Sequence, residues 1–210
     1  FGRGKAAEAA PRVAAFGSQV FLLHGTPARA DWLAEALAGQ GCTVSRFVVN
    51  GEPDIAMIEA ATQAAKRAQV VVALGGGAVI DAGKAVAAMV PANRPLLDHL
   101  EVIGKSLPLD QAPLPFVALP TTAGTGAEVT RNAVIGSPAH QRKVSLRDKR
   151  MLPALAIIDP ALTDHTPKSI TLASGLDAIT QVIEPYICTR ANRLTDALCR
   201  DAIPLGLRAL

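Results

Sequence analysis

Three consecutive glycines, Gly75, Gly76 and Gly77, follow an apolar run and open a stretch with helical periodicity. Without side chains this backbone lets an anion approach closely, and the N–H groups and dipole at a helix start favour negative charge. Asp81 and Lys84 follow in the first turns. The segment predicts a nucleotide-phosphate site, although the same glycines also suit a tight turn that only allows close packing. The spacing matches neither a Walker loop nor GxGxxG, so the site is of another type.

A second polar segment, residues 120–130, also comes directly after an apolar run. It places Thr121, Thr122 and Thr125 beside two glycines. Hydroxyl groups donate hydrogen bonds to phosphate or amide groups without adding charge or bulk. Together with the glycine triplet on another strand of the same sheet, this segment predicts a ligand crevice at the carboxyl ends of the strands.

Asp177 and Gln181 form a third candidate site, because a spacing of four residues puts both on one face of a helix. Asp followed by His at this spacing is a plausible half of a metal site. Here the second residue is Gln, whose neutral amide oxygen is a poorer ligand for a transition metal than imidazole. The alternative for Asp177 is a plain carboxylate near a helix start.

The elements that must position these residues alternate between short apolar runs and segments of helical spacing, which predicts an α/β fold with a parallel sheet. The uninterrupted apolar runs are typical of strands covered on both faces. We expect strands at residues 20–24, 43–49, 70–74, 116–119 and 154–158, and helices at 28–37, 54–67 and 79–89.

Beyond residue 167 the sequence shows helical spacing and no strand candidate, so we divide the chain into an α/β domain, 1–167, and the start of an all-helical domain, 168–210. Between the expected strands at 116–119 and 154–158 we expect a loop-rich excursion. Its basic segment, residues 140–150, is interpreted as a solvated loop, with a phosphate patch as the alternative.

Composition excludes several classes of function. Half of the residues are hydrophobic (50%) and 19% are charged, which indicates a globular core, while only 3% are aromatic, which disfavours stacking on single-stranded nucleic acid. The cysteines, Cys42, Cys188 and Cys199, lack zinc or redox spacing, so we expect a reducing, cytoplasmic setting. No apolar run approaches the roughly 20 residues that cross a bilayer.

In order and spacing, these segments resemble the iron-containing, or group III, alcohol dehydrogenase family, which is related to glycerol dehydrogenase and dehydroquinate synthase. The resemblance rests on five matches in register: FGRG at 1–4, GGGAVIDAGK at 75–84, PTTAGTGAEVT at 120–130, DP at 159–160, and GLDAITQVIEPY at 175–186 continuing into ANRLTDAL at 191–198.

The resemblance implies an oxidoreductase that transfers a hydride between a nicotinamide dinucleotide and a small alcohol or its aldehyde or ketone. It places the pyrophosphate at Gly75, Gly76 and Gly77, with Asp81 and Lys84 in the same crevice. It places Thr121, Thr122 and Thr125 along the phosphates and nicotinamide. Homo-oligomers are common in the family.

The family also implies a divalent metal, iron more often than zinc, which would act as a Lewis acid on the alcohol oxygen. Asp177 matches the first ligand, but Gln181 stands where the second is normally His. Of the histidines present, His24 and His99 are expected at the surface or in caps rather than as ligands. The departure leaves three alternatives open. Gln181 is a weak ligand or a neighbour of a metal that Asp177 and residues beyond 210 hold, or the protein is a metal-independent carbonyl reductase, similar to maleylacetate reductase. The third alternative is a catalytically inactive dinucleotide-binding protein.

The choice between NAD and NADP also stays open. Relatives that prefer NAD often carry an acidic residue just after the first strand, where this chain has Gly25 and Thr26. Without a carboxylate there, a 2′-phosphate would not be repelled, and Arg29 is a conceivable partner for it.

Overall fold

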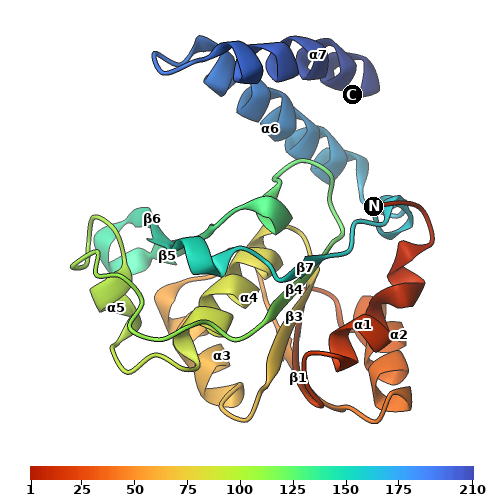
Figure 1. Cartoon of the computed structure of the whole chain (residues 1–210), viewed down its shortest axis with the longest axis vertical. Coiled ribbons are helices and arrows are strands. Elements are labelled where there is room, and N and C mark those ends of the chain that lie inside the picture. The colour runs from red at the N-terminus through yellow and green to blue at the C-terminus, as the bar shows by residue number, and fades with distance from the viewer.

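The computed structural model describes residues 1–210, and its centre is a five-stranded parallel sheet of order β2-β1-β3-β4-β7 (Figure 1). The strands are β1 (Gln19–His24), β2 (Thr43–Val48), β3 (Val70–Gly75), β4 (Phe116–Pro120) and β7 (Leu155–Ala156). Every residue of β3 and β4 is buried, as their uninterrupted apolar sequences require. The α/β class expected from the sequence is confirmed.

Helices cover both faces of the sheet and divide the core into two layers. Phe21 and Leu23 of β1 pack into the layer under α3 (Ile55–Ala64) and α4 (Gly77–Met89). Val20 and Leu22 point the other way, into the layer under α1 (Ala9–Ala14) and α2 (Pro27–Gly39). Successive side chains of a strand alternate between faces, so both must be apolar in a strand buried on two sides.

The chain reverses its direction of travel across the sheet between β1 and β3. It passes from β1 outward to β2, returns to β3 on the other side of β1, and continues to β4 and β7. Ligands in open α/β sheets bind beyond the carboxyl ends of the strands at such a switch point. The turn after β3 and the loop after β4 therefore lie at the edge where a ligand is expected.

The segment between β4 and β7 contains a β-hairpin, so the prediction of a solvated basic loop at residues 140–150 was wrong. Strand β5 (Asn132–Ser137) pairs antiparallel with β6 (Arg142–Arg147). The basic residues of β6 point outward, while Val144 and Leu146 between them are buried in the core. This alternation of polar and apolar side chains is the signature of a half-buried strand.

Two histidines expected at the surface or in caps are instead buried, with 2% of His24 and 3% of His99 exposed. His24 Nε2 accepts a hydrogen bond from Arg46 Nε at 3.2 Å. His99 ends the short helix α5 (Leu96–His99), and its Nδ1 lies 3.0 Å from the Leu107 carbonyl oxygen. In each imidazole a protein partner satisfies one ring nitrogen, while His24 Nδ1 and His99 Nε2 are buried without a hydrogen-bond partner.

The N-terminal segment is fastened to the end of the sheet domain by Asp159. Its carboxylate accepts hydrogen bonds from the backbone N–H groups of Gly4, Ala6 and Ala161 at 3.1, 2.8 and 2.9 Å. These bonds hold the pKa of Asp159 below its usual value, the one from Ala6 contributing most. Two of the motifs that carry the family resemblance, at 1–4 and 159–160, therefore meet in space.

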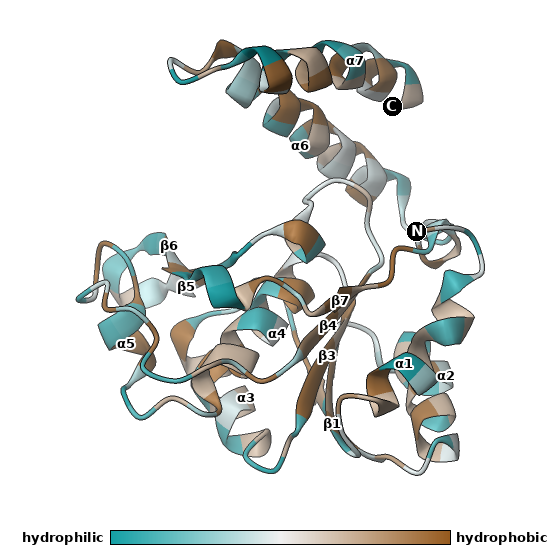
Figure 2. Cartoon of the chain, viewed as in Figure 1, coloured by the Kyte–Doolittle hydropathy of each residue, from teal (hydrophilic) through white to brown (hydrophobic).

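The last two helices, α6 (Lys168–Ile187) and α7 (Arg193–Ala209), stand beyond the carboxyl edge of the sheet (Figure 1). Asn192 begins α7 with a capping box, in which its side chain accepts from the Thr195 N–H and the Thr195 hydroxyl accepts from the Asn192 N–H. Hydrophobic and hydrophilic residues alternate along both helices (Figure 2), and Leu172, Leu176, Leu194 and Leu198 are among the apolar residues that they expose. None of the helices is long and apolar enough to cross a membrane.

Short 3-10 turns complete the chain at Lys5–Glu8, Ala127–Val129, Pro138–His140, Lys149–Met151 and Pro160–Thr163.

Candidate functional site

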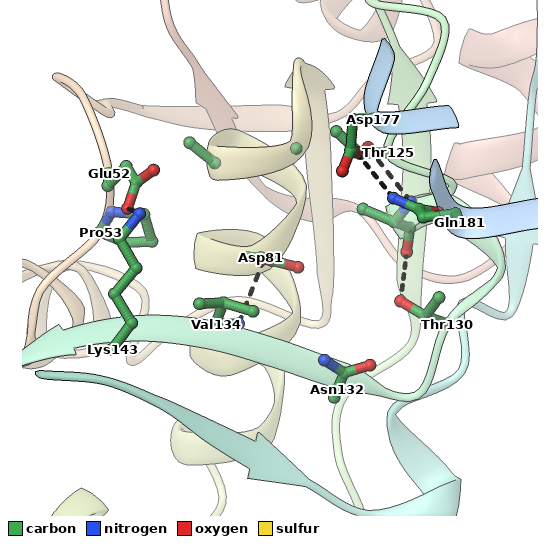
Figure 3. Close-up of a pocket in the computed structure, with 13 residues that line it drawn as sticks. Glu52, Pro53, Asp81, Thr125, Thr130, Asn132, Val134, Lys143, Asp177 and Gln181 are labelled. Carbon is green, nitrogen blue, oxygen red and sulfur yellow. Dashed lines mark hydrogen bonds and ion pairs between the residues drawn. The ribbon is translucent and has the colours of Figure 1, made fainter. Parts of the chain in front are cut away.

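A cavity of about 480 Å³ lies between the start of α4, the loop after β4, the β5–β6 hairpin and α6 (Figure 3). Its walls bring together segments from five separate parts of the chain, because the loop after β2 contributes Glu52 and Pro53. The lining residues are Glu52, Pro53, Gly77, Ala78, Asp81, Thr125, Ala127, Thr130, Asn132, Val134, Lys143, Asp177 and Gln181.

The three glycines of this turn have different roles, because some allow close packing of α4 on the sheet and others leave the backbone accessible to a ligand. A Cβ on Gly75 would lie 2.5 Å from Val79 Cγ2, so this glycine is needed to bring the first turn of α4 onto β3. Gly76 is the N-cap of α4, and no side chain caps the N–H groups that follow it. Gly77 lines the cavity. The first N–H groups of α4 are thus available to an anion.

The threonine loop lies directly against the glycine turn. The Thr121 N–H donates to the Gly75 carbonyl oxygen at 3.0 Å. A Cβ on Gly76 would lie 3.3 Å from Thr122 Cγ2, and one on Gly77 would lie 3.0 Å from Thr125 Cγ2. The structure therefore brings the two predicted segments together. Of the three threonines, only Thr125 lines the cavity.

Asp81 and Lys84 occupy different surroundings although both lie on α4. Asp81 lines the cavity, and its Oδ2 accepts from the Val134 N–H at 3.1 Å (Figure 3). Lys84 does not line it: its side chain is 0% exposed, and Nζ lies 3.3 Å from Asp81 Oδ1. Burial raises the pKa of Asp81 and lowers the pKa of Lys84, and the attraction between the two charges opposes both shifts.

Asp177 and Gln181 lie side by side on α6 and face the cavity, as their spacing predicts. Gln181 Nε2 donates to Asp177 Oδ2 at 2.7 Å (Figure 3). Catalytic zinc sites take three protein ligands, whereas this helix supplies one carboxylate and one amide, and nowhere in the structure do three His, Cys, Asp or Glu side chains converge. Within residues 1–210, Asp177 and Gln181 therefore offer at most two ligands to a metal ion.

Gln181→His is expected to increase metal binding at this point. Imidazole is a better ligand than an amide oxygen for first-row divalent metals, so we expect the dissociation constant for Fe²⁺ or Zn²⁺ to fall by about tenfold or more, roughly 1.4 kcal/mol. Elemental analysis after dialysis against each metal measures the retained amount. Thr180→His, at the neighbouring exposed position, is the control, and equal metal content in the two variants would argue against a ligand pair at Asp177.

Among the cavity residues that sequence reasoning missed, two are charged, Lys143 and Glu52. Lys143 of β6 forms an ion pair with Glu52 at the far side of the cavity from α6 (Figure 3). Lys143 belongs to the basic segment 140–150, and its position at the cavity follows from the hairpin.

Arg29, which the sequence suggests as a partner for a 2′-phosphate, donates instead to the Leu162 carbonyl oxygen at 2.8 Å.

Comparison with known proteins agrees with these features. The family model for iron-containing alcohol dehydrogenases matches residues 1–160. The probable alcohol dehydrogenase EutG of Salmonella typhimurium is 38% identical over 176 residues, which are 82% of this chain and 44% of that protein. The crystal structure of NADH-dependent butanol dehydrogenase A from Thermotoga maritima is 26% identical with a TM-score of 0.88, over 99% of this chain and 54% of that one.

Sulfoacetaldehyde reductase from Bifidobacterium kashiwanohense, solved in complex with NAD⁺, is 29% identical with a TM-score of 0.88, over 98% of this chain and 56% of that one. The chain thus spans about half the length of the relatives it matches. Residues 1–160, which the family model matches, include the glycine turn, the threonine loop and the β5–β6 hairpin. On this evidence, the chain belongs to the iron-containing alcohol dehydrogenase family.

Proposed function

We propose that the cavity binds a nicotinamide dinucleotide with its pyrophosphate against residues 75–77. The observation that carries this proposal is the uncapped start of α4, whose glycines lie against Thr122 and Thr125 at the switch point of the sheet. The family membership supports it, and so do two relatives, one described as NADH-dependent and one solved with NAD⁺.

Both NAD and NADP stay within the proposal. Neither Gly25 nor Thr26 after β1 carries a charge that would repel a 2′-phosphate. Arg29 would have to give up its bond to the Leu162 carbonyl oxygen to reach one.

The proposed reaction is hydride transfer between the dinucleotide and a small alcohol or its aldehyde or ketone. The names of the alcohol and butanol dehydrogenase relatives support this class of substrate. On the α6 side of the cavity, Asp177 offers a carboxylate and Gln181 an amide, and the second amide N–H of Gln181 is free to donate to a substrate oxygen. Such a donor would stabilise the negative charge that develops on that oxygen.

The bond from Gln181 to Asp177 favours a second candidate, carbonyl reduction without a metal. In this version the protein supplies hydrogen bonds rather than a Lewis acid at the substrate oxygen.

A cytoplasmic location and the formation of homo-oligomers are also part of the proposal. The location is supported by the three free cysteines, and the homo-oligomer by analogy with the family.

The test is a titration of the protein with NADH and with NADPH, followed by nicotinamide fluorescence. A panel of short alcohols and aldehydes is then assayed by absorbance at 340 nm, before and after chelation and iron addition. Turnover that needs added iron supports metal assistance, and turnover unaffected by chelation supports the metal-independent reaction. Binding without any turnover would indicate a dinucleotide-binding protein, and absence of binding would overturn the proposal.

A further inference from the structure

The ammonium group of Lys84 is entirely engaged by the protein. Nζ donates to Thr130 Oγ1 at 2.9 Å and to the Asn132 carbonyl oxygen at 2.6 Å, and it lies 3.3 Å from Asp81 Oδ1. An ammonium group has three N–H donors, and four acceptors surround this one within 3.4 Å, the fourth being the Thr130 carbonyl oxygen. With its side chain 0% exposed, Lys84 has no donor left for a ligand in the cavity.

The acceptors connect Lys84 to the cavity wall through a short chain of hydrogen bonds. Thr130 Oγ1, which accepts from Lys84, donates to the Ala127 carbonyl oxygen at 3.2 Å. The Ala127 N–H in turn donates to Thr125 Oγ1 at 3.3 Å. Thr125 lines the cavity and packs against Gly77. The position of the Thr125 hydroxyl therefore depends on a network that begins at the buried ammonium group.

A second connection runs through Asp81. Its Oδ1 faces Lys84, and its Oδ2 accepts from the Val134 N–H of β5. Lys84 and Asp81 thus attach the same side of α4 to the beginning of β5. Removal of a partner from a buried charged network leaves uncompensated groups, which costs far more than the net contribution of the network.

We propose that Lys84 is a positioning residue, which fastens residues 125–134 to α4 and so sets the Thr125 hydroxyl against the glycine turn, without touching the dinucleotide. The proposal rests on the proposed dinucleotide site. It assigns to Lys84 a role different from the cofactor contact that the sequence suggests, because a phosphate contact requires a free N–H group and this lysine has none.

Two variants test the network at two adjacent members, Lys84 and Thr130. Lys84→Met removes the ammonium group and keeps an unbranched stem, and Thr130→Val removes the hydroxyl that relays its position. We expect each to raise the NADH dissociation constant about tenfold and to speed amide exchange in residues 125–134. Because both substitutions break the same network, the NADH dissociation constant of the double variant should be no higher than that of the single variant with the higher dissociation constant. Additive losses would indicate separate contacts and overturn the proposal.

Salt dependence separates positioning from direct contact. A lysine that neutralises a phosphate contributes to the change of affinity with ionic strength, since its charge interaction is screened. We therefore expect the slope of log Kd against log salt concentration to be the same in Lys84→Met and the unaltered protein. A shallower slope, with Thr130→Val binding normally, would show that Lys84 contacts the phosphates.

Two controls and one contingency complete the experiment. Lys66→Met removes an exposed lysine charge, and Ile80→Val removes one methyl group from the core on α4 itself without touching the Lys84 network. Neither should change NADH affinity or exchange in residues 125–134. If Lys84→Met does not fold, Thr130→Val is judged alone by exchange and by salt slope. If the unaltered protein does not bind NADH, the dinucleotide site fails, while the exchange data still decide whether Lys84 holds the loop.

Discussion

Gly76→Val is expected to raise the NADH dissociation constant by at least tenfold, about 1.4 kcal/mol. Gly76 is the N-cap of α4, and its φ of −75° is accessible to valine, so the change introduces bulk rather than backbone strain. The new Cβ would lie 3.3 Å from Thr122 Cγ2, and the two methyl groups would occupy the approach to the first N–H groups of the helix. Fluorescence titration with NADH measures the effect.

The matched control is Gly39→Val at the end of α2, where a Cβ meets nothing within 4 Å. It introduces the same side chain far from the cavity and should leave NADH affinity unchanged. Unaltered affinity in Gly76→Val would mean that the pyrophosphate does not lie against this turn. The glycines would then serve packing alone, as Gly75 does against Val79.

Gly124→Ala is expected to separate the threonine loop from α6. A Cβ at this position would lie 2.0 Å from the Ser174 carbonyl oxygen and 2.5 Å from its carbonyl carbon. Both are backbone atoms of α6, so no change of rotamer relieves the collision and the two segments must move apart. We expect a loss of roughly 1–3 kcal/mol of stability and at least tenfold faster amide exchange in α6, measured by thermal melts and hydrogen exchange.

NADH affinity should change less in Gly124→Ala than in Gly76→Val, because the glycine turn is untouched, while any turnover should fall as Asp177 and Gln181 shift with α6. Gly126→Ala is the control. Its φ of 61° is strained for alanine, but the nearest atom to its Cβ is 3.8 Å away, so it tests strain in the loop without a collision. Equal exchange in α6 for both variants would contradict the contact argument.

The sequence predicts those parts of the fold that are determined by local pattern. Strands β1, β3 and β4 were found because a strand buried on both faces must be apolar at every position, as at residues 70–74. The spacing of Asp177 and Gln181 correctly places both on one helix face, since helix geometry alone decides it.

Features that depend on contacts between distant segments could not be predicted from local sequence pattern. Residues 140–150 are rich in charged side chains, which favours the interpretation as a loop. The structure shows instead that Val144 and Leu146 are buried in a strand that pairs with β5. The family resemblance places Lys84 in the cofactor crevice, and the sequence gives no sign of its acceptors, Thr130 and Asn132, which lie more than forty residues later. Contacts of this kind appear only once the distant segments are brought together by the fold.

The parallel sheet has a consequence for how the chain reaches its native state. Gln19 pairs with Thr43, Val20 with Val70 and Val71 with Phe116, so no strand pair of the sheet can form before a long loop closes. Only β5 and β6 are joined by a short turn, from Ser137 to Arg142. Since the entropy of loop closure must be overcome before such distant contacts stabilise anything, folding should be slow, with the hairpin and the helices forming ahead of the sheet.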